Sequence, residues 1–384
     1  MKSNNKLGLC PIVEEKFCTG CSACMNICSK GAITMKENAI GHILPFVSQE
    51  LCIDCGICSK VCPSIDNSDI LNKIDHVYAA WARDVEEHNS STSGGVSAVI
   101  ARYIVQSGGV VYGCASLAGG KVEHIRIDSE EDLFKIKGSK YVQSEINFTY
   151  KAVKFDLKNR KKVLFTGAPC QVAGLKKFLM KDYENLYTMD LICHGVPSQK
   201  LLKDHISYLG FNLNDIDRIS FREGGYYLAL WEGRKAVYKQ DDMHDLFYSG
   251  FNDSLFSRES CVNCKYTKIK RTGDITMADF HKLGVDVPFK LNTEGNVSLL
   301  TVNTRKGGEL FDLVKDRFVI DKRTIEEAIK GNPQLTKPCI RKSDYNKFVR
   351  IYSQRGYEYA CKRVMWLRLI KNQILSVMYR IKAL

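Results

Sequence analysis

Cysteine is the residue type through which this chain of 384 residues can do most chemistry, because it contains sixteen of them. Eight form two runs with the same spacing, C-x2-C-x2-C-x3-C, offset by 34 residues. The runs are Cys18, Cys21, Cys24 and Cys28, then Cys52, Cys55, Cys58 and Cys62. Thiolates at this spacing line a compact loop that can surround a cuboidal cluster. Zinc also accepts C-x2-C pairs but rarely uses four thiolates in each run, so the pattern favours two 4Fe-4S clusters.

The fourth cysteine of each run is expected to bind the cluster of the other run. It lies further along the chain than the other three, where we expect it to open a short helix and point away from their loop. Cluster one would therefore be held by Cys18, Cys21, Cys24 and Cys62. Cluster two would be held by Cys52, Cys55, Cys58 and Cys28.

A second set of four cysteines lies far from these repeats. Cys170 follows a predicted strand and opens a predicted helix, where free N–H groups and the helix dipole stabilise a thiolate. Cys193 also follows a predicted strand, and Cys261 and Cys264 form a C-x2-C pair in a basic loop. Spacing alone leaves three interpretations open: a third iron–sulfur cluster, a zinc site, or buried core cysteines beside an incidental pair.

The four remaining cysteines, Cys10, Cys114, Cys339 and Cys361, have no partner nearby in the sequence. Free cysteine commonly behaves as a small buried hydrophobe, and we expect that role for each of them. His194, next to Cys193, is compatible with a proton relay beside a cofactor and equally with a structural role.

Two glycine-containing loops are candidates for binding an anion. The loop S-S-T-S-G-G (90–95) precedes a predicted helix, where hydroxyl and backbone N–H groups suit a phosphate. The loop K-G-S-K-Y-V-Q-S (137–144) carries two lysines among small residues and suits a diphosphate. Ordinary N-caps and solvated loops are the alternatives. No G-x-G-x-x-G follows a strand and no G-x4-G-K-[ST] occurs, which argues against a Rossmann or P-loop site.

The elements that must position these residues begin at Val77, after a polar stretch (66–75) that we interpret as a linker. Residues 77–335 are expected to form one mixed α/β domain. Helical spacing of apolar residues predicts a helix over 96–108, and Pro169 predicts the start of another. Ser129 followed by Asp132 predicts a capped helix at 129–137. Strands are predicted over 110–115, 162–167, 186–192 and 296–304.

Composition is that of an ordinary globular protein, with 45% apolar and 26% charged residues, which excludes a collagen-like or mostly disordered chain. No run of 18 apolar residues occurs, and the first residues lack an apolar signal core. We therefore expect a cytoplasmic protein whose cysteines serve as ligands or redox groups rather than disulfides. The net charge of +13 is concentrated in residues 341–384, and no nucleic-acid motif accompanies it, so no nucleic-acid partner is expected.

The end of the chain combines apolar residues at helical spacing with an excess of cations. The apolar positions are Trp366, Ile370, Ile374, Val377 and Ile381, and the cations are Lys362, Arg363, Arg368, Lys371, Arg380 and Lys382. A basic amphipathic helix of this kind suits peripheral contact with an anionic membrane on the cytoplasmic face. Packing on the core or on a partner protein, and a disordered tail, are the alternatives.

The cysteine repeats resemble the bacterial ferredoxin with two 4Fe-4S clusters, with Ser29 in place of the usual proline after the first run and Pro63 retained after the second. Further motifs follow in order: T-S-G-G, G-S-K-Y-V-Q, T-G-A-P-C-Q, D-L-I-C-H-G-V-P, S-F-R-E, C-x2-C and D-I-T-M-A-D-F. From residue 12 to about 305 the chain thus resembles the coenzyme F-420 hydrogenase/dehydrogenase beta-subunit family, in the form that carries its own ferredoxin domain.

The resemblance implies an α+β chain with three parts. These are a dicluster ferredoxin domain (1–75), a mixed α/β domain for FAD and iron–sulfur (76–340), and a basic helical tail (341–384). It implies that Cys170, Cys193, Cys261 and Cys264 hold a third 4Fe-4S cluster. FAD would contact Thr92, Ser93, Gly94, Gly95, Lys140 and Tyr141. The family often has a glycine and an aromatic residue where this chain has Ala278 and His281, which puts the substrate side of the pocket in question.

The implied function is an FAD- and iron–sulfur-dependent oxidoreductase. It would pass electrons between a soluble two-electron carrier, such as the deazaflavin coenzyme F-420, and clusters that lead to a redox partner. One alternative is a ferredoxin-like electron-transfer subunit without substrate chemistry of its own. Another is a zinc-stabilised scaffold protein.

Overall fold

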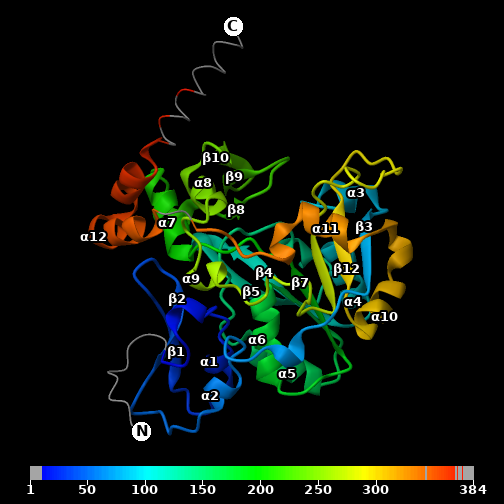
Figure 1. Cartoon of the computed structure of the whole chain (residues 1–384), viewed down its shortest axis with the longest axis horizontal. Coiled ribbons are helices and arrows are strands. Elements are labelled where there is room, and N and C mark those ends of the chain that lie inside the picture. The colour runs from blue at the N-terminus through cyan, green and yellow to red at the C-terminus, as the bar shows by residue number, and fades with distance from the viewer. Residues whose placement is uncertain (1–10, 342–343, 368–369, 371–373, 375–384) are drawn as a thin grey trace.

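The computed structural model describes residues 11–341, 344–367, 370 and 374. Cys10 lies outside them. The N-terminal part is a ferredoxin-like unit built on an antiparallel hairpin, in which Ile33 pairs with Val47. Its elements are η1 (Glu15–Phe17), α1 (Ala23–Ile27), β1 (Ile33–Glu37), β2 (Ile43–Val47), α2 (Ile57–Lys60) and η2 (Ser68–Ile70). Figure 1 shows this unit in blue, beside α6 of the larger domain.

The fourth cysteine of each run does not open a helix, so that expectation is wrong. Cys28 is the C-cap of α1 and has an extended backbone, with φ −68° and ψ 107°. Cys62 follows Val61, the C-cap of α2. The short helices instead carry the third cysteines, Cys24 and Cys58, and then end. Because the fourth cysteine lies beyond the helix, the direction of its side chain is not restricted to the helix face that carries the third cysteine.

A mixed eight-stranded sheet forms the centre of the larger domain, in the order β13-β3-β12-β11-β7-β6-β4-β5. Its strands are β3 (His76–Ala82), β4 (Val110–Leu117), β5 (Lys121–Ile127), β6 (Val163–Gly167), β7 (Leu186–Leu191), β11 (Ile275–Asp279), β12 (Ser298–Val302) and β13 (Phe318–Arg323). The four central strands β4, β6, β7 and β11 are parallel, and antiparallel strands flank them on both sides. The carboxyl ends of β6, β7 and β11 therefore meet at one edge of the sheet.

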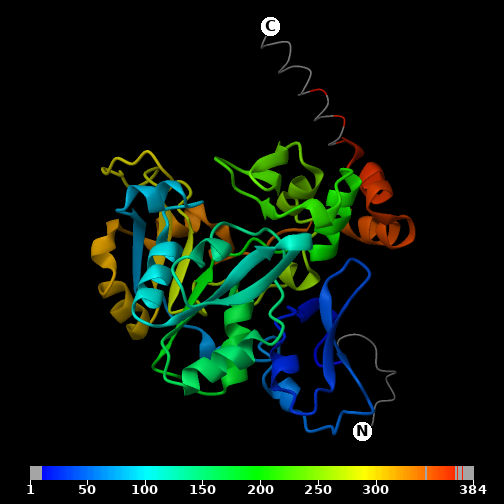
Figure 2. The same cartoon turned by 180° about the vertical axis from the view of Figure 1, so that it is seen from behind.

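Helices cover both faces of this sheet (Figures 1 and 2). Alternate residues of a strand point to opposite faces. Leu164 packs with α4 (Val96–Gln106) and α10 (Arg305–Asp312) on one face. Val163 and Phe165 pack with α5 (Thr149–Lys158) and α6 (Pro169–Leu179) on the other. Other helical elements are α3 (Val85–Asn89), α11 (Ile325–Gly331), η3 (Ala118–Gly120), η4 (Leu133–Ile136), η6 (Lys315–Arg317) and η7 (Pro333–Leu335).

The predicted strands and the helices at 96–108 and from Pro169 are confirmed to within a few residues. The predicted helix at 129–137 is wrong, because only the short 3-10 turn η4 forms there and its N-cap makes no side-chain hydrogen bond. The predicted linker is hydrogen-bonded to the larger domain: Asn72 N–H donates to Arg271 O (2.8 Å) and Asp75 N–H to Val302 O (2.8 Å).

A smaller sheet and four helices form a second layer above the ferredoxin-like unit (Figure 1). Its strands pair antiparallel in the order β10-β9-β8. The elements are β8 (Arg218–Ser220), β9 (Tyr227–Glu232), β10 (Lys235–Asp241), α7 (Gln199–Tyr208), α8 (Leu246–Asn252), α9 (Glu259–Val262), α12 (Tyr345–Val364) and the turn η5 (Leu213–Asp215). Apolar side chains of α7, α8 and α12 share one core with this sheet.

The C-terminal helix α12 is kinked at Gly356, which has a positive φ of 78°. It buries Phe348, Tyr352 and Cys361 in the shared core. Beyond it, Trp366, Leu367, Ile370 and Ile374 are exposed, while Val377 and Ile381 lie outside the described residues. In the part of the chain that the structure describes, no helix combines the length and apolar character needed to cross a membrane.

Arg258 joins the ferredoxin-like unit to the larger domain. It is the N-cap of α9, and only 3% of it is exposed. Its guanidinium donates to Cys18 O (2.7 Å) and Ile43 O (2.7 Å) in the ferredoxin-like unit, and to Gln143 Oε1 (2.9 Å) in the larger domain. Its backbone N–H donates to Val196 O (3.0 Å). One buried cation therefore fixes the loop of Cys18 against the helix that carries Cys261.

Replacing Arg258 with methionine is expected to lower the free energy of unfolding by about 3 kcal/mol, because buried carbonyls lose their charged donor. Denaturant unfolding under anaerobic conditions measures the change, and hydrogen exchange should show lost protection around Cys18 and Ile43. The control Arg305→Met removes an arginine whose side chain is 73% exposed and should change stability by less than about 0.5 kcal/mol. Equal effects of the two variants would contradict this role.

Candidate functional site

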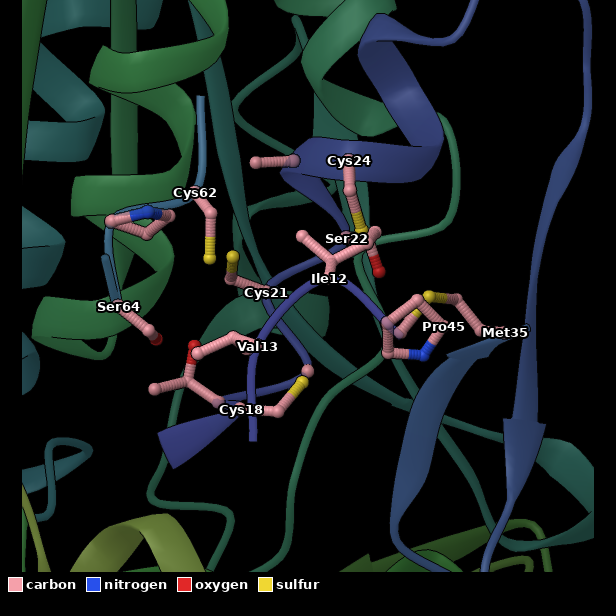
Figure 3. Close-up of a pocket in the computed structure, with 14 residues that line it drawn as sticks. Ile12, Val13, Cys18, Cys21, Ser22, Cys24, Met35, Pro45, Cys62 and Ser64 are labelled. Atoms are coloured by element: carbon pink, nitrogen blue, oxygen red, sulfur yellow. The ribbon is translucent and has the colours of Figure 1, made fainter. Parts of the chain in front are cut away.

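The first candidate metal site is a small cavity in the ferredoxin-like unit. Cys18, Cys21, Cys24 and Cys62 all line it, together with Ser22 and Ser64 (Figure 3). The first three come from one loop and α1, whereas Cys62 comes from the loop after α2. The thiols also interact electrostatically: Cys24 with Cys21, Cys18 and Cys62, and Cys21 with Cys62 and Cys18. This grouping is the one expected for crossed ligation.

The chemistry of this cavity fits a bound cluster. Burial raises the pKa of the Cys21 thiol to about 12, and the neighbouring Cys62 and Cys18 contribute to that increase. Thiolates are the form that binds iron, so a positively charged group must take the place of the protons. The hydroxyl of Ser22, 2% exposed, has no hydrogen-bond partner among the described residues. A buried unpaired donor beside four thiols suits a cluster sulfur, which accepts hydrogen bonds from N–H and O–H groups.

The second candidate metal site lies closer to the surface. Cys28, Cys52 and Cys58 pack against the same apolar cluster, which contains Met25, Ile33 and Val47. Cys55 is exposed. The structure therefore brings Cys28 of the first run to the second run, and it leaves one cysteine of the second run at the surface of the protein.

The third candidate metal site lies at the carboxyl ends of the parallel strands. Cys170 is the second residue of α6, which begins just after β6, and Cys193 lies just beyond the end of β7. Cys261 lies in α9, and Cys264 lies just after it. Electrostatic interactions connect every pair among these four thiols. The structure thus brings together residues that lie 94 positions apart in the sequence, between Cys170 and Cys264.

Hydrogen bonds and one cation favour charged sulfur at this third site. Burial raises the pKa of Cys193 to about 12, whereas the N–H of Gly195 and the charge of Arg271 oppose that increase. Gly195 N–H donates to Cys193 Sγ (3.4 Å), and Tyr266 N–H donates to Cys264 Sγ (3.4 Å). Such N–H···S bonds stabilise thiolates and tune the potential of a bound cluster.

The buried Asp190 holds the loops of the third site together. Its carboxylate accepts from Thr272 Oγ1 (2.7 Å), Gly273 N (3.0 Å), Thr276 Oγ1 (2.5 Å) and Arg271 Nη2 (3.2 Å). Arg271 also donates to Leu191 O (3.0 Å), two residues before Cys193. The aspartate of the D-L-I-C-H-G-V-P motif therefore positions the cysteine that follows it.

The first and third sites are neighbours. Tyr266, 3% exposed, donates through its hydroxyl to Pro63 O (3.4 Å), next to Cys62. Its side chain also interacts electrostatically with four thiols of the two sites, Cys170, Cys21, Cys264 and Cys62. A Cβ at Gly174 would lie 3.0 Å from Cys21 Sγ, so the absence of a side chain lets α6 approach the first site. The two sites therefore share one buried boundary, formed by Tyr266, Cys170 and Cys21.

The candidate FAD residues lie in two loops that Arg222 joins. Arg222 donates to Thr92 O (2.8 Å), Tyr141 Oη (3.4 Å) and Asp279 Oδ2 (2.8 Å). Ser93 and Gly94 both contact Ser298 Oγ, each at 2.9 Å, which anchors the loop before α4 to the start of β12. A Cβ at Gly94 would lie 2.2 Å from Ala80 O, so this position requires glycine. Gly95 is the N-cap of α4.

Lys140 is a partly buried cation in the second of these loops. Its Nζ donates to Lys137 O (2.6 Å). Burial lowers its pKa, and the nearby Cys114 opposes that change. Tyr141 stacks on Phe251 with ring centroids 5.0 Å apart. An ammonium held in a partly buried loop suits a phosphate oxygen, while the tyrosine ring is fixed by packing.

His194 lies between the candidate FAD residues and the third site. Burial lowers its pKa, as does the nearby His281, and Asp279 opposes them. Asp279 ends β11, so His194 and Asp279 lie at adjacent strand ends. Ligands of open α/β sheets bind outside the carboxyl ends of the strands, which is where this group lies.

Several residues of these sites escaped prediction from the sequence. Arg222 and Asp279 lie in motifs that were noted, S-F-R-E and D-I-T-M-A-D-F, but their ion pair could be found only in three dimensions. Tyr266 gave no signal in the sequence. Among the lone cysteines, Cys361 is buried as expected and Cys114 is partly buried. Cys339 lies beside Cys193, Cys261 and Cys264, so its description as an isolated hydrophobe is incomplete.

Two family models match parts of the chain. Residues 17–65 match the 4Fe-4S dicluster domain, and residues 160–328 match the C-terminal region of the coenzyme F420 hydrogenase/dehydrogenase beta subunit.

Two curated relatives match most of its length. The coenzyme F420-dependent sulfite reductase of Methanocaldococcus jannaschii is 23% identical over 368 residues, which cover 90% of this chain and 54% of that protein. One subunit of the F(420)H(2) dehydrogenase of Methanosarcina mazei is 22% identical over 367 residues, which cover 88% of this chain and 97% of that protein. The chain thus spans about half the length of the sulfite reductase.

Among solved structures, a chain of the F420-reducing [NiFe] hydrogenase complex from Methanosarcina barkeri is similar, with a TM-score of 0.43 and 17% identity. The match covers 77% of this chain and 92% of that chain.

Crossed ligation leads to a prediction for the two fourth cysteines. Cys62→Ser should remove the cluster in the buried first site, and Cys28→Ser should remove the more exposed second cluster, because each serves the opposite run. Paramagnetic resonance of reduced samples distinguishes the two signals, and iron analysis counts the loss. Cys114→Ser is the matched control and should retain all iron. If Cys28→Ser removes the first cluster and spares the second, the ligand assignment is wrong.

Proposed function

We propose that the chain is an iron–sulfur flavoprotein oxidoreductase, because residues 160–328 match the C-terminal region of the coenzyme F420 hydrogenase/dehydrogenase beta subunit and residues 17–65 match the 4Fe-4S dicluster domain. It would exchange electrons between a two-electron carrier at FAD and three 4Fe-4S clusters. The relatives named for coenzyme F420 make that deazaflavin the first candidate carrier.

The observation that carries this proposal is the continuous order of the candidate sites. Arg222 and Asp279 join the FAD loops, and Asp279 lies near His194. His194 is adjacent to Cys193 of the third site. Cys170 of that site lies near Cys21 of the first, and Cys24 and Cys28 connect the first site with the second. The series ends at the exposed Cys55, so it leads from the FAD loops to the surface of the ferredoxin-like unit.

FAD, when bound, would supply the conversion between two-electron and single-electron transfer. The chain's own residues would bind and orient it. Lys140 would neutralise phosphate charge, and the loop at 92–95, whose Gly94 N–H donates to Ser298 Oγ, would hold the phosphate at the N-terminus of α4. The Arg222–Asp279 pair would fix both loops in one geometry. His194, whose pKa burial lowers, would stay neutral at pH 7 and hold a proton at one ring nitrogen only.

The thiols would hold the clusters and set their potentials through burial and N–H···S bonds. The first and third clusters would be enclosed by protein, and the second would be the exchange point with a redox partner because Cys55 reaches the surface.

The identity of the two-electron carrier is the main variable of this proposal. Ala278 and His281 differ from the glycine and the aromatic residue that the family often has on the substrate side of its pocket. A two-electron carrier other than the deazaflavin is therefore the main variant. Peripheral membrane contact through the basic C-terminal residues remains a further proposal.

Anaerobic purification with analysis of iron, sulfide, zinc and flavin tests this function. About twelve irons per chain together with FAD are expected from three clusters. About eight irons without flavin would support the ferredoxin-like carrier instead, and zinc without sulfide would support a scaffold.

Cys193→Ala should lower the iron content from about twelve to about eight and interrupt electron transfer between flavin and the ferredoxin-like unit, because the third cluster connects them. Bound FAD should stay at the wild-type level. Flavin reduction by a chemical hydride donor, followed by stopped-flow absorbance, measures the interruption. Cys361→Ala, on α12 in the shared core, is the control. Full iron content in Cys193→Ala would remove the third cluster from the proposal.

Lys140→Gln should weaken FAD binding about tenfold without loss of iron, because one charge-assisted hydrogen bond contributes about 1.5 kcal/mol. Flavin retained after gel filtration, and titration of the flavin-free protein with FAD, measure the change. Lys135→Gln is the matched control from the same segment, since the Lys135 side chain is exposed and paired with Asp132. Unchanged FAD affinity in Lys140→Gln would exclude this lysine from the site.

A further inference from the structure

Five thiols, and not four, lie near the third candidate metal site. Cys339 lies on the segment after η7, outside the residues that the family model matches. Cys339 interacts electrostatically with Cys193, Cys261 and Cys264. Cys170 interacts with the same three thiols. These five residues therefore contain two overlapping sets of four thiols, which share the face formed by Cys193, Cys261 and Cys264.

Gly195 shows how closely Cys339 approaches that shared face. Its N–H donates to Cys193 Sγ (3.4 Å). A Cβ built on the same glycine would lie 3.4 Å from Cys339 Sγ and 3.4 Å from Cys261 Cβ. Gly195 has a φ of 99°, a conformation that favours glycine, so both space and backbone geometry disfavour a side chain here. The glycine thus lets three cysteines from separate segments meet around one point.

Cys170 and Cys339 differ in their other neighbours. Cys170 interacts with Cys21 of the first site and lies at the start of α6. The surroundings of Cys339 are the hydroxyls of Ser254 and Ser257 and the guanidinium of Arg341. Arg341 donates to Ser257 O (3.0 Å), which fixes the segment of Cys339 against the turn before α9.

Ser257 directs a hydroxyl at Cys339. It is fully buried, and its hydroxyl interacts with the Cys339 thiol in the sense that favours charged sulfur. The same Oγ would lie 2.9 Å from the Cβ built on Gly195, on the side of Cys339. A hydroxyl that donates to sulfur stabilises the thiolate, which is the form of cysteine that binds iron.

We propose that Cys339 is an alternative fourth ligand of the third cluster, able to replace Cys170 on the same iron. This inference rests on the proposed function, because it requires that cluster. In the exchange, the iron–sulfur bond to Cys170 breaks as the bond to Cys339 forms, and the proton of the Cys339 thiol passes to the Cys170 thiolate. Neither iron nor sulfur changes its oxidation state. Since only Cys170 adjoins Cys21, ligation by Cys339 lengthens the route to the first cluster.

Iron content of the full chain, purified anaerobically, tests the exchange. Cys170→Ala and Cys339→Ala should each retain about twelve irons, whereas the double variant should fall to about eight, because three thiols leave one iron without a ligand. Cys193→Ala, which removes a ligand common to both sets, is the matched comparison. This single substitution should be sufficient to lose the third cluster. Loss of the same amount of iron from Cys170→Ala as from Cys193→Ala overturns the proposal.

Two further measurements separate ligand exchange from a structural role. Alkylation of the native protein, followed by mass spectrometry, should modify Cys339 in the wild type and leave it protected in Cys170→Ala. Electron transfer from the third to the first cluster should slow at least tenfold in Cys170→Ala and stay unchanged in Cys339→Ala. Alkylation of Cys339 in Cys170→Ala overturns the exchange. If the wild-type protein contains only about eight irons, the third cluster itself is absent and the proposed function fails. That result differs from the alkylation result that overturns the ligand exchange alone.

Discussion

The buried guanidinium of Arg258 is the interaction on which the relative position of the candidate metal sites depends. A charged group in this environment is tolerated only when its donors are paired, and three of them find oxygen acceptors in two different domains. One acceptor is the carbonyl of Cys18, and the residue itself caps the helix of Cys261. The separation between the first and third sites is therefore set by a rigid, planar side chain rather than by a flexible linker.

Desolvation of sulfur is the second constraint. Burial raises the pKa of Cys21, Cys24, Cys170, Cys193 and Cys261, so these thiols would remain protonated at neutral pH if nothing bound them. If these thiols stayed protonated, a buried donor such as the Ser22 hydroxyl would have no acceptor among the described residues. Binding of iron would remove the protons and supply acceptors, so folding of these loops and assembly of any cluster they hold are expected to be coupled.

The parallel part of the sheet explains why the candidate flavin and metal sites share one edge. Strands β6, β7 and β11 run in the same direction, so the residues that follow or end them, Cys170, Cys193 and Asp279, meet at their carboxyl ends. The antiparallel strands β12 and β3 then bring Ser298 to the loop of Gly94. The lateral order of strands thus decides which loops become neighbours, and the close approaches at Gly94, Gly174 and Gly195 allow them to meet.

Local spacing in the sequence was sufficient to identify the two cysteine runs, the crossed grouping of Cys62 with Cys18, and the start of α6 at Pro169, because each depends on geometry within a few residues or within one repeated unit. It was also sufficient to suggest the loops at 92–95 and 137–144. It could not show that Arg222 pairs with Asp279 or that Cys339 joins Cys193. The residues of these two pairs are 57 and 146 positions apart in the sequence. Their proximity follows from strand order and domain packing, which periodicity along a single chain does not encode.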